Sequence, residues 1–90
     1  MHVTINTGAV PDAEVPITNS AADKVRMSFN PSSNEQVDRI KALAAALISE
    51  CEDVFNQTNV GETKAQATLA MRHVQTASMW SVLAATGPKD

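Results

Sequence analysis

Basic residues lie on both sides of an aromatic residue about one third of the way along the chain. Arg26 precedes the turn-forming sequence Phe29-Asn30-Pro31, and Arg39 and Lys41 follow it. An exposed aromatic ring can stack on a nucleobase, and flanking cations can bind phosphate oxygens. Two readings stay open. In one, the turn binds a nucleotide; in the other, which the spacing alone favours, Phe29 packs as a hydrophobic staple before a helix and the cations are solvated.

The other side chains that could carry chemistry are isolated in the sequence. Cys51 has no CxxC partner, and His2 and His73 lie far apart. Structural zinc needs three or four such ligands at workable spacing, so no metal site is expected. Antiparallel helices could pair Cys51 with His73, but Cys51 falls in an apolar pattern typical of a buried, inert thiol. With no glycine-rich phosphate loop, GxSxG or HExxH, the sequence predicts a protein that is not an enzyme and uses no cofactor.

Length and composition narrow the class of protein further. Ninety residues allow one small domain, and 43% hydrophobic residues suffice for a core. The net charge of −3 argues against binding of duplex nucleic acid, whose affinity comes mostly from phosphate neutralisation. No apolar run approaches the length of a membrane span, and no secretory signal is recognised. The single cysteine fits a reducing cytoplasm.

The element after the turn is predicted to be a helix over about 33–55. Ser32 with Glu35 forms a capping box after Pro31, and apolar residues then recur every three or four positions. The predicted core-facing stripe consists of Val37, Ile40, Leu43, Ala44, Leu47, Ile48, Cys51, Val54 and Phe55. The predicted solvent face consists of Asp38, Lys41, Ser49, Glu52 and Asp53.

A second helix is predicted over 60–86, with Asn59 and Glu62 as its cap and Gly87-Pro88 as its stop. Residues 74–86 contain no charge, so this half of the helix must be buried nearly all round. One partner helix cannot do that, and a hairpin of about 55 residues is too small to be comfortably stable alone. The residues expected to mediate self-association are Val74, Met79, Trp80, Val82 and Leu83.

The predicted fold is therefore all-α, an antiparallel two-helix hairpin assembled into a homo-oligomer. Residues 29–90 are expected to form this hairpin domain, and residues 1–28 a flexible arm. Within the arm, residues 2–6 alternate like one short strand, and no second strand is recognised to pair with it. The alternative to self-association is that the arm folds back over the uncharged half of the second helix.

The order of motifs resembles a phage family. The sequences Phe29-Asn30-Pro31 and Glu35-Gln36-Val37, a long alanine-rich helix, a short loop and a second helix ending Ala77-Ser78-Met79-Trp80 are similar to small helical-hairpin proteins. These proteins are cyclic-nucleotide sponges that counter the CBASS and Thoeris antiviral systems of bacteria. The resemblance covers residues 29–86, and the Met-Trp pair is its most specific element.

The resemblance implies a phage anti-defence protein that binds without cleaving. Such proteins are homo-oligomers, typically hexamers, and their ligands are cyclic di- or trinucleotides of the cyclic GMP-AMP type or cyclic ADP-ribose-type signals. Sequestration in the cytoplasm of the infected bacterial host withholds the signal from its effector.

The resemblance also implies where a cyclic dinucleotide would bind. The family usually has Tyr at the position of Phe29, followed by His or Asn and then Pro, and this turn contributes to the pocket. The family's basic residue on the first helix falls on Ala44 here, so Lys41 or Arg39 would have to substitute.

A second departure concerns the start of the second helix. The family often has Ser-Arg-Glu where this chain has Gly61-Glu62-Thr63, so Lys64 or Arg72 would have to replace the missing arginine of the trinucleotide pocket. The candidate ligand-binding residues are Arg26, Phe29, Asn30, Pro31, Arg39, Lys41, Lys64 and Arg72.

A hypothesis from a different class stays open beside the sponge. The uncharged stretch 74–86 would also suit a small helical adaptor or inhibitor that covers a host protein. Thermal stabilisation by cyclic oligonucleotides would support the sponge, whereas capture of one host protein would support the adaptor.

Overall fold

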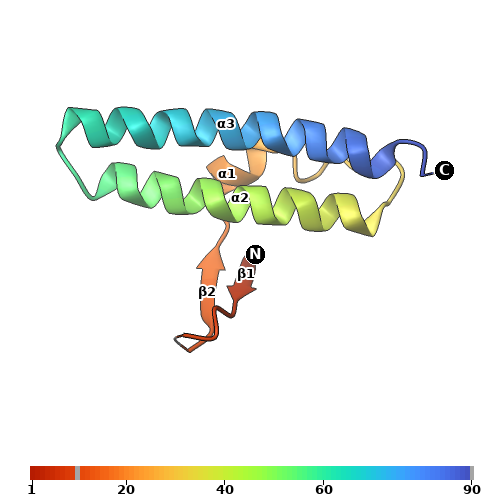
Figure 1. Ribbon diagram of the computed structural model, residues 1–90, viewed down its shortest axis with the longest axis horizontal. Helices are drawn as coiled ribbons and strands as arrows, with labels where there is room; N and C mark the ends of the chain where they lie inside the picture. Colours follow the sequence, from red (N-terminus) through yellow and green to blue (C-terminus); the bar gives the residue numbers. More distant parts are fainter. Residues whose placement is uncertain (10, 90) are drawn as a thin grey trace.

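Two long antiparallel helices dominate the computed structural model, which describes residues 1–9 and 11–89. Along the chain, the elements are β1 (His2–Ile5), β2 (Ala13–Pro16), α1 (Asn19–Lys24), α2 (Glu35–Asn56) and α3 (Gly61–Thr86). Helices α2 and α3 lie side by side along the longest axis, whereas β1 and β2 project from one side (Figure 1). The predicted helical hairpin is confirmed.

The cap of α2 differs from the predicted one. The helix begins at Glu35, and Asn34 caps it by accepting hydrogen bonds from the amides of Gln36 and Val37. Ser32 is therefore not the cap. Ser33 lies in the left-handed region at φ 52°, which a helical residue cannot adopt. The predicted end at 55 is one residue short of the observed end.

The predicted side-chain cap of α3 is also wrong. Val60 precedes the helix and makes no side-chain capping bond. Instead, the hydroxyl of Thr58 accepts a hydrogen bond from the amide of Val60, which shapes the turn between the helices. The predicted end at Thr86 is confirmed.

The N-terminal segment contains more structure than one unpaired strand, so that prediction is wrong. β1 pairs antiparallel with β2, with Val3 opposite Val15. Gly8 allows the chain to reverse between them, since it adopts φ 76° and donates a hydrogen bond from its amide to the side chain of Asn6. The described residues are mostly helical and form three helices and a small two-stranded sheet, instead of an all-α fold.

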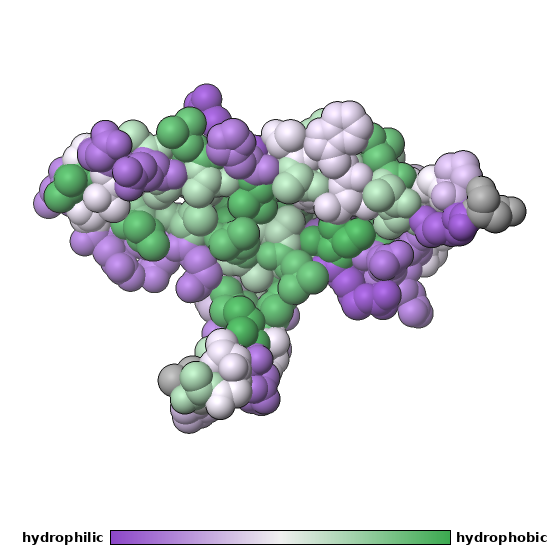
Figure 2. Space-filling view, viewed as in Figure 1, coloured by the Kyte–Doolittle hydropathy of each residue, from purple (hydrophilic) through white to green (hydrophobic). Residues whose placement is uncertain are grey.

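The core lies where this N-terminal segment crosses α2. Its buried residues are Val15, Ile17, Ala21, Val25, Ala45, Ala46 and Ile48, and Met71 and Val74 of α3 pack against them. Ala21 of α1 and Ala45 and Ala46 of α2 are all buried in this cluster, so small side chains lie where α1 meets α2. The view in Figure 2 shows apolar surface continuing from the two long helices onto the base of the small sheet.

This packing reverses the predicted faces of α2 at several positions. Lys41 and Ser49, expected in solvent, are buried. Leu43 and Leu47, expected in the core, are 61% and 52% exposed. The spacing of apolar residues correctly indicates an apolar stripe along α2. The N-terminal segment, however, covers the adjacent face of the helix, which carries Lys41 and Ser49. Part of the stripe is thereby left without cover from the described residues of its own chain.

The uncharged half of α3 is only partly covered. The turn after α1 lies against one side of it, where Ser78 is buried, while Met79, Trp80 and Leu83 are 68%, 68% and 60% exposed. The N-terminal segment therefore folds back over one side of the uncharged half of α3, as the alternative to self-association expects, but an apolar face of this half stays exposed. Among the described helices, none is both long and apolar enough to cross a membrane.

Candidate functional site

A pocket of about 460 Å³ lies between the turn after α1, the start of α2 and the C-terminal half of α3. We call it the Phe29 pocket. Its lining residues are Lys24, Val25, Arg26, Phe29, Lys41, Gln75, Ser78, Met79, Val82 and Leu83. The lining therefore combines residues predicted to bind ligand with residues predicted to mediate assembly.

The charged side chains that line the Phe29 pocket are all positive, although Lys24 is also paired with Glu52 outside the lining. Lys24, Arg26 and Lys41 contribute to the lining, and among its described residues there is no carboxylate. This concentration of cations occurs in a chain whose net charge is −3. Phe29 is 60% exposed, so its ring is available to a planar group. The arrangement suits an anion that also carries an aromatic or apolar part.

The turn that carries Arg26 and Phe29 has a defined shape. Arg26 adopts φ 54°, and its carbonyl accepts a hydrogen bond of 2.9 Å from the amide of Phe29. The ammonium group of Lys41 donates to the carbonyls of both Arg26 and Phe29, and it lies 5.6 Å from the centre of the Phe29 ring.

The structure places Asn30, Pro31 and Arg39 outside this lining. Asn30 donates from its side-chain amide to the carbonyl of Asn34 and to Asp38, and so fixes the start of α2. Pro31 and Arg39 are exposed.

Lys64 and Arg72 also lie elsewhere on the molecule. The ammonium of Lys64 donates to the carbonyl of Phe55 at 2.8 Å and lies 3.9 Å from the centre of that ring, at the end of the hairpin where α2 joins α3. Arg72 is exposed on α3. These two residues are therefore not brought together with Phe29.

Sequence reasoning missed two polar residues of the pocket. Ser78 is 6% exposed and Gln75 is half-buried, and both line the pocket from α3. Helical spacing could have found them, because positions 75, 78, 79 and 82 share one face of a helix. The side-chain amide nitrogen of Gln75 donates to the carbonyl of Met71, and this bond fixes the orientation of the side-chain oxygen of Gln75.

A comparison with known protein families shows which family this chain belongs to. The model of the Acb2/Tad1 hairpin domain matches residues 19–86. The chain belongs to the Acb2/Tad1 hairpin-domain family. This is the phage cyclic-nucleotide sponge family, of the anti-CBASS and anti-Thoeris type, so the resemblance seen in the sequence is confirmed. No curated protein and no solved structure matches the chain in parallel searches.

The match to the Acb2/Tad1 hairpin domain begins at Asn19, the first residue of α1, instead of at residue 29. The part that matches therefore includes α1 and the turn of the Phe29 pocket, whereas β1 and β2 precede it. The division of the chain at residue 28 stays a prediction.

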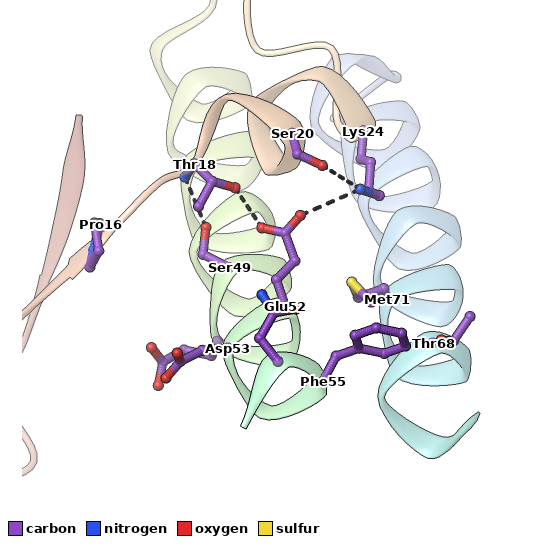
Figure 3. A pocket seen from close by; sticks show the side chains of 12 residues that line it. Pro16, Thr18, Ser20, Lys24, Ser49, Glu52, Asp53, Phe55, Thr68 and Met71 are labelled. Carbon is purple, nitrogen blue, oxygen red and sulfur yellow. Dashed lines mark hydrogen bonds and ion pairs between the residues drawn. The ribbon is translucent and has the colours of Figure 1, made fainter. Parts of the chain in front are cut away.

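A second pocket of about 750 Å³ adjoins the start of α1 in this Acb2/Tad1 hairpin (Figure 3). Glu52 of α2 accepts a hydrogen bond of 2.5 Å from the hydroxyl of Thr18 and forms an ion pair of 3.5 Å with Lys24. The amide of Thr18 donates to the hydroxyl of Ser49. These bonds join the N-terminal segment to α2 and hold Lys24, which also lines the Phe29 pocket.

The carboxyl group of Glu52 makes this junction sensitive to pH. Burial raises the pKa of Glu52, but hydrogen bonds from Thr18 and Ser20 together with the charge of Lys24 outweigh it, and the pKa lies below its ordinary value of 4.5. The stabilisation is therefore complete above pH 4.5 and is lost as the pH falls through the lowered pKa.

We expect Glu52→Gln to reduce the acid sensitivity of the fold. The variant should be less stable than the wild type near neutral pH, and the difference should shrink as the pH falls below about 4.5. Urea unfolding at a series of pH values measures it, with Glu50→Gln as the control for an exposed carboxylate on the same helix. An unchanged difference at all pH values would contradict the assigned role of Glu52.

Cys51 has the environment of an unreactive thiol. It is half-buried, and burial followed by the nearby charge of Glu50 raises the pKa of its thiol. The thiolate is therefore disfavoured near neutral pH. His73 is exposed on α3. Within residues 1–9 and 11–89, no group of three His, Cys, Asp or Glu side chains is placed to hold a metal ion.

Proposed function

We propose that this chain binds a cyclic oligonucleotide signal of bacterial antiviral defence and sequesters it without cleavage, in the cytoplasm of the infected host. Membership of the Acb2/Tad1 family supports the ligand class. The observation that carries the proposal is the Phe29 pocket, in which an exposed aromatic ring adjoins three cations in an acidic protein.

The chemistry of the ligand fits this lining. Cyclic dinucleotides of the cyclic GMP-AMP type carry two phosphates and two planar bases. Cyclic trinucleotides carry three of each, and cyclic ADP-ribose-type signals combine a pyrophosphate with one adenine base, so all three classes pair phosphate charge with at least one stackable ring. A base would stack on Phe29, and a phosphate would meet the exposed guanidinium of Arg26. Gln75 and Ser78 would supply hydrogen bonds from α3.

A homo-oligomer, a hexamer by the family resemblance, completes the proposal. Met79 and Leu83 line the pocket and extend into the exposed apolar face that includes Trp80. A second copy that covers this face would also close the pocket over a ligand, and a twofold axis would present two Phe29 rings to one cyclic dinucleotide. Val74 packs against the core of its own chain, so we expect it to contribute less to this interface than the exposed residues.

Native mass spectrometry with a panel of cyclic di- and trinucleotides tests binding, stoichiometry and assembly together. We expect an oligomer that retains ligand, and intact cyclic nucleotide recovered after heat denaturation of the protein. Linear product that depends on the protein would overturn sequestration and indicate a phosphodiesterase. Absence of binding to the whole panel, with specific capture of one host protein, would favour the adaptor hypothesis.

A further inference from the structure

We infer that Lys41 is a positioning residue of the Phe29 pocket: it holds the turn that carries Arg26 and Phe29, and Arg26 makes the phosphate contact. This inference rests on the proposed function. It differs from the expectation from the sequence, in which Lys41 or Arg39 meets the phosphate directly.

The burial of Lys41 is the first observation. Only 5% of the residue is exposed, although lysine is almost never fully buried unless its charge is paired. The ion pairs among the described residues are His2–Glu14 and Lys24–Glu52, so Lys41 has no carboxylate partner there. Its partners are the carbonyl oxygens of Arg26 and Phe29 and the face of the Phe29 ring.

The geometry of the turn explains why these bonds are needed. Arg26 has a left-handed backbone conformation, which is disfavoured for a residue with a side chain and persists only when surrounding contacts impose it. The carbonyl of Arg26 accepts both the amide of Phe29 and the ammonium of Lys41. Lys41 therefore fixes both ends of a four-residue turn with one side chain.

Of the three cations that line the pocket, only Arg26 has a side chain that makes no hydrogen bond or ion pair with the described residues. Lys41 directs two of its three N–H donors to carbonyls. Lys24 is bonded to Ser20 and paired with Glu52. Arg26 is exposed and lines the pocket, and its guanidinium can bind phosphate through two parallel hydrogen bonds.

The test compares Lys41→Met with Arg26→Gln, using cyclic GMP-AMP as the probe. Affinity measured over a series of salt concentrations reports direct phosphate contact, because removal of a contacting cation reduces the salt dependence. Amide hydrogen exchange reports whether the turn is held, through protection of the Phe29 amide. Lys89→Met is the matched control, since Lys89 also donates to backbone carbonyls, those of Ala84, Ala85 and Gly87, at the exposed end of α3.

We expect Lys41→Met to weaken binding at least tenfold, to leave the salt dependence unchanged and to expose the Phe29 amide to exchange. Arg26→Gln should weaken binding and reduce the salt dependence while the amide stays protected. Lys41→Gln, which keeps an N–H donor without the charge, should lose less protection and affinity than Lys41→Met.

The inference is overturned if Lys41→Met reduces the salt dependence as Arg26→Gln does, or if it leaves affinity and exchange unchanged. Equal losses in Lys41→Met and Lys41→Gln with an intact turn would also overturn it, because charge alone would then matter. Failure of the wild type to bind any cyclic nucleotide would instead contradict the proposed function, while the exchange data would still decide whether Lys41 holds the turn.

Discussion

Trp80→Glu is expected to dissociate the proposed oligomer into folded single chains. Trp80 is 68% exposed in one chain, so a carboxylate at this position stays solvated in the monomer. In the proposed assembly, the same carboxylate would be buried without a partner, at a cost of about 3–5 kcal/mol. Sedimentation measures the change in mass, and circular dichroism shows that the helices remain.

Two comparisons sharpen this experiment. Gln36→Glu adds the same charge to the exposed first turn of α2 and should leave the assembly intact. Val82→Glu alters a half-buried residue of α3, so it should reduce the stability of the chain as well as its association. A wild-type protein that sediments as a monomer at micromolar concentration would contradict the proposed interface.

Phe29→Ala is expected to weaken the binding of a cyclic dinucleotide by about 1–3 kcal/mol, the usual contribution of one base–aromatic stack. If two copies of the ring contact one ligand, the loss would be roughly double that. The melting temperature of the free protein should change little, because the ring is mostly exposed and its removal leaves no cavity in the core. Calorimetry on wild type and variant measures the difference.

Phe29→Tyr is the matched control, since it keeps the ring and adds only a hydroxyl at an exposed position. Its affinity should be close to that of the wild type. The hydrophobic-staple reading makes the opposite prediction for Phe29→Ala: the melting temperature falls while the affinity is unchanged. That result would place the ligand elsewhere on the protein.

The long helices could be predicted from the sequence because their signals are local. Spacing of apolar residues and the Gly87-Pro88 stop are properties of neighbouring positions, and the observed ends of α2 and α3 agree within about two residues. The small sheet could not be predicted in the same way. The alternation at residues 2–6 indicates the first strand, but the pairing with β2 depends on a reversal near Gly8 and on burial of Val15 against α2.

The residues of the candidate site could be placed from the sequence only in part, and Lys41 shows why. Its residue type and its distance from Phe29 along the chain suggested a phosphate ligand, and the structure does place it at the same pocket. Its hydrogen bonds to two carbonyls depend on the path of the N-terminal segment across α2, which periodicity does not encode. Ser49 was misplaced for the same reason, because the amide of Thr18 covers it.

The junction between Thr18 and α2 implies an order of events during synthesis. Thr18 is bonded to Ser49 and Glu52, which follow it by 31 and 34 residues. A ribosome releases the N-terminal segment first, yet the surface that receives it exists only after α2 has emerged and formed. The bonds from Thr18 to Ser49 and Glu52 close a longer loop than the short turn that joins α2 to α3, and closing a longer loop costs more chain entropy. The turn that carries Phe29 is thus made before the helix whose Lys41 holds it, and it can take its final shape only after this part of α2 has formed.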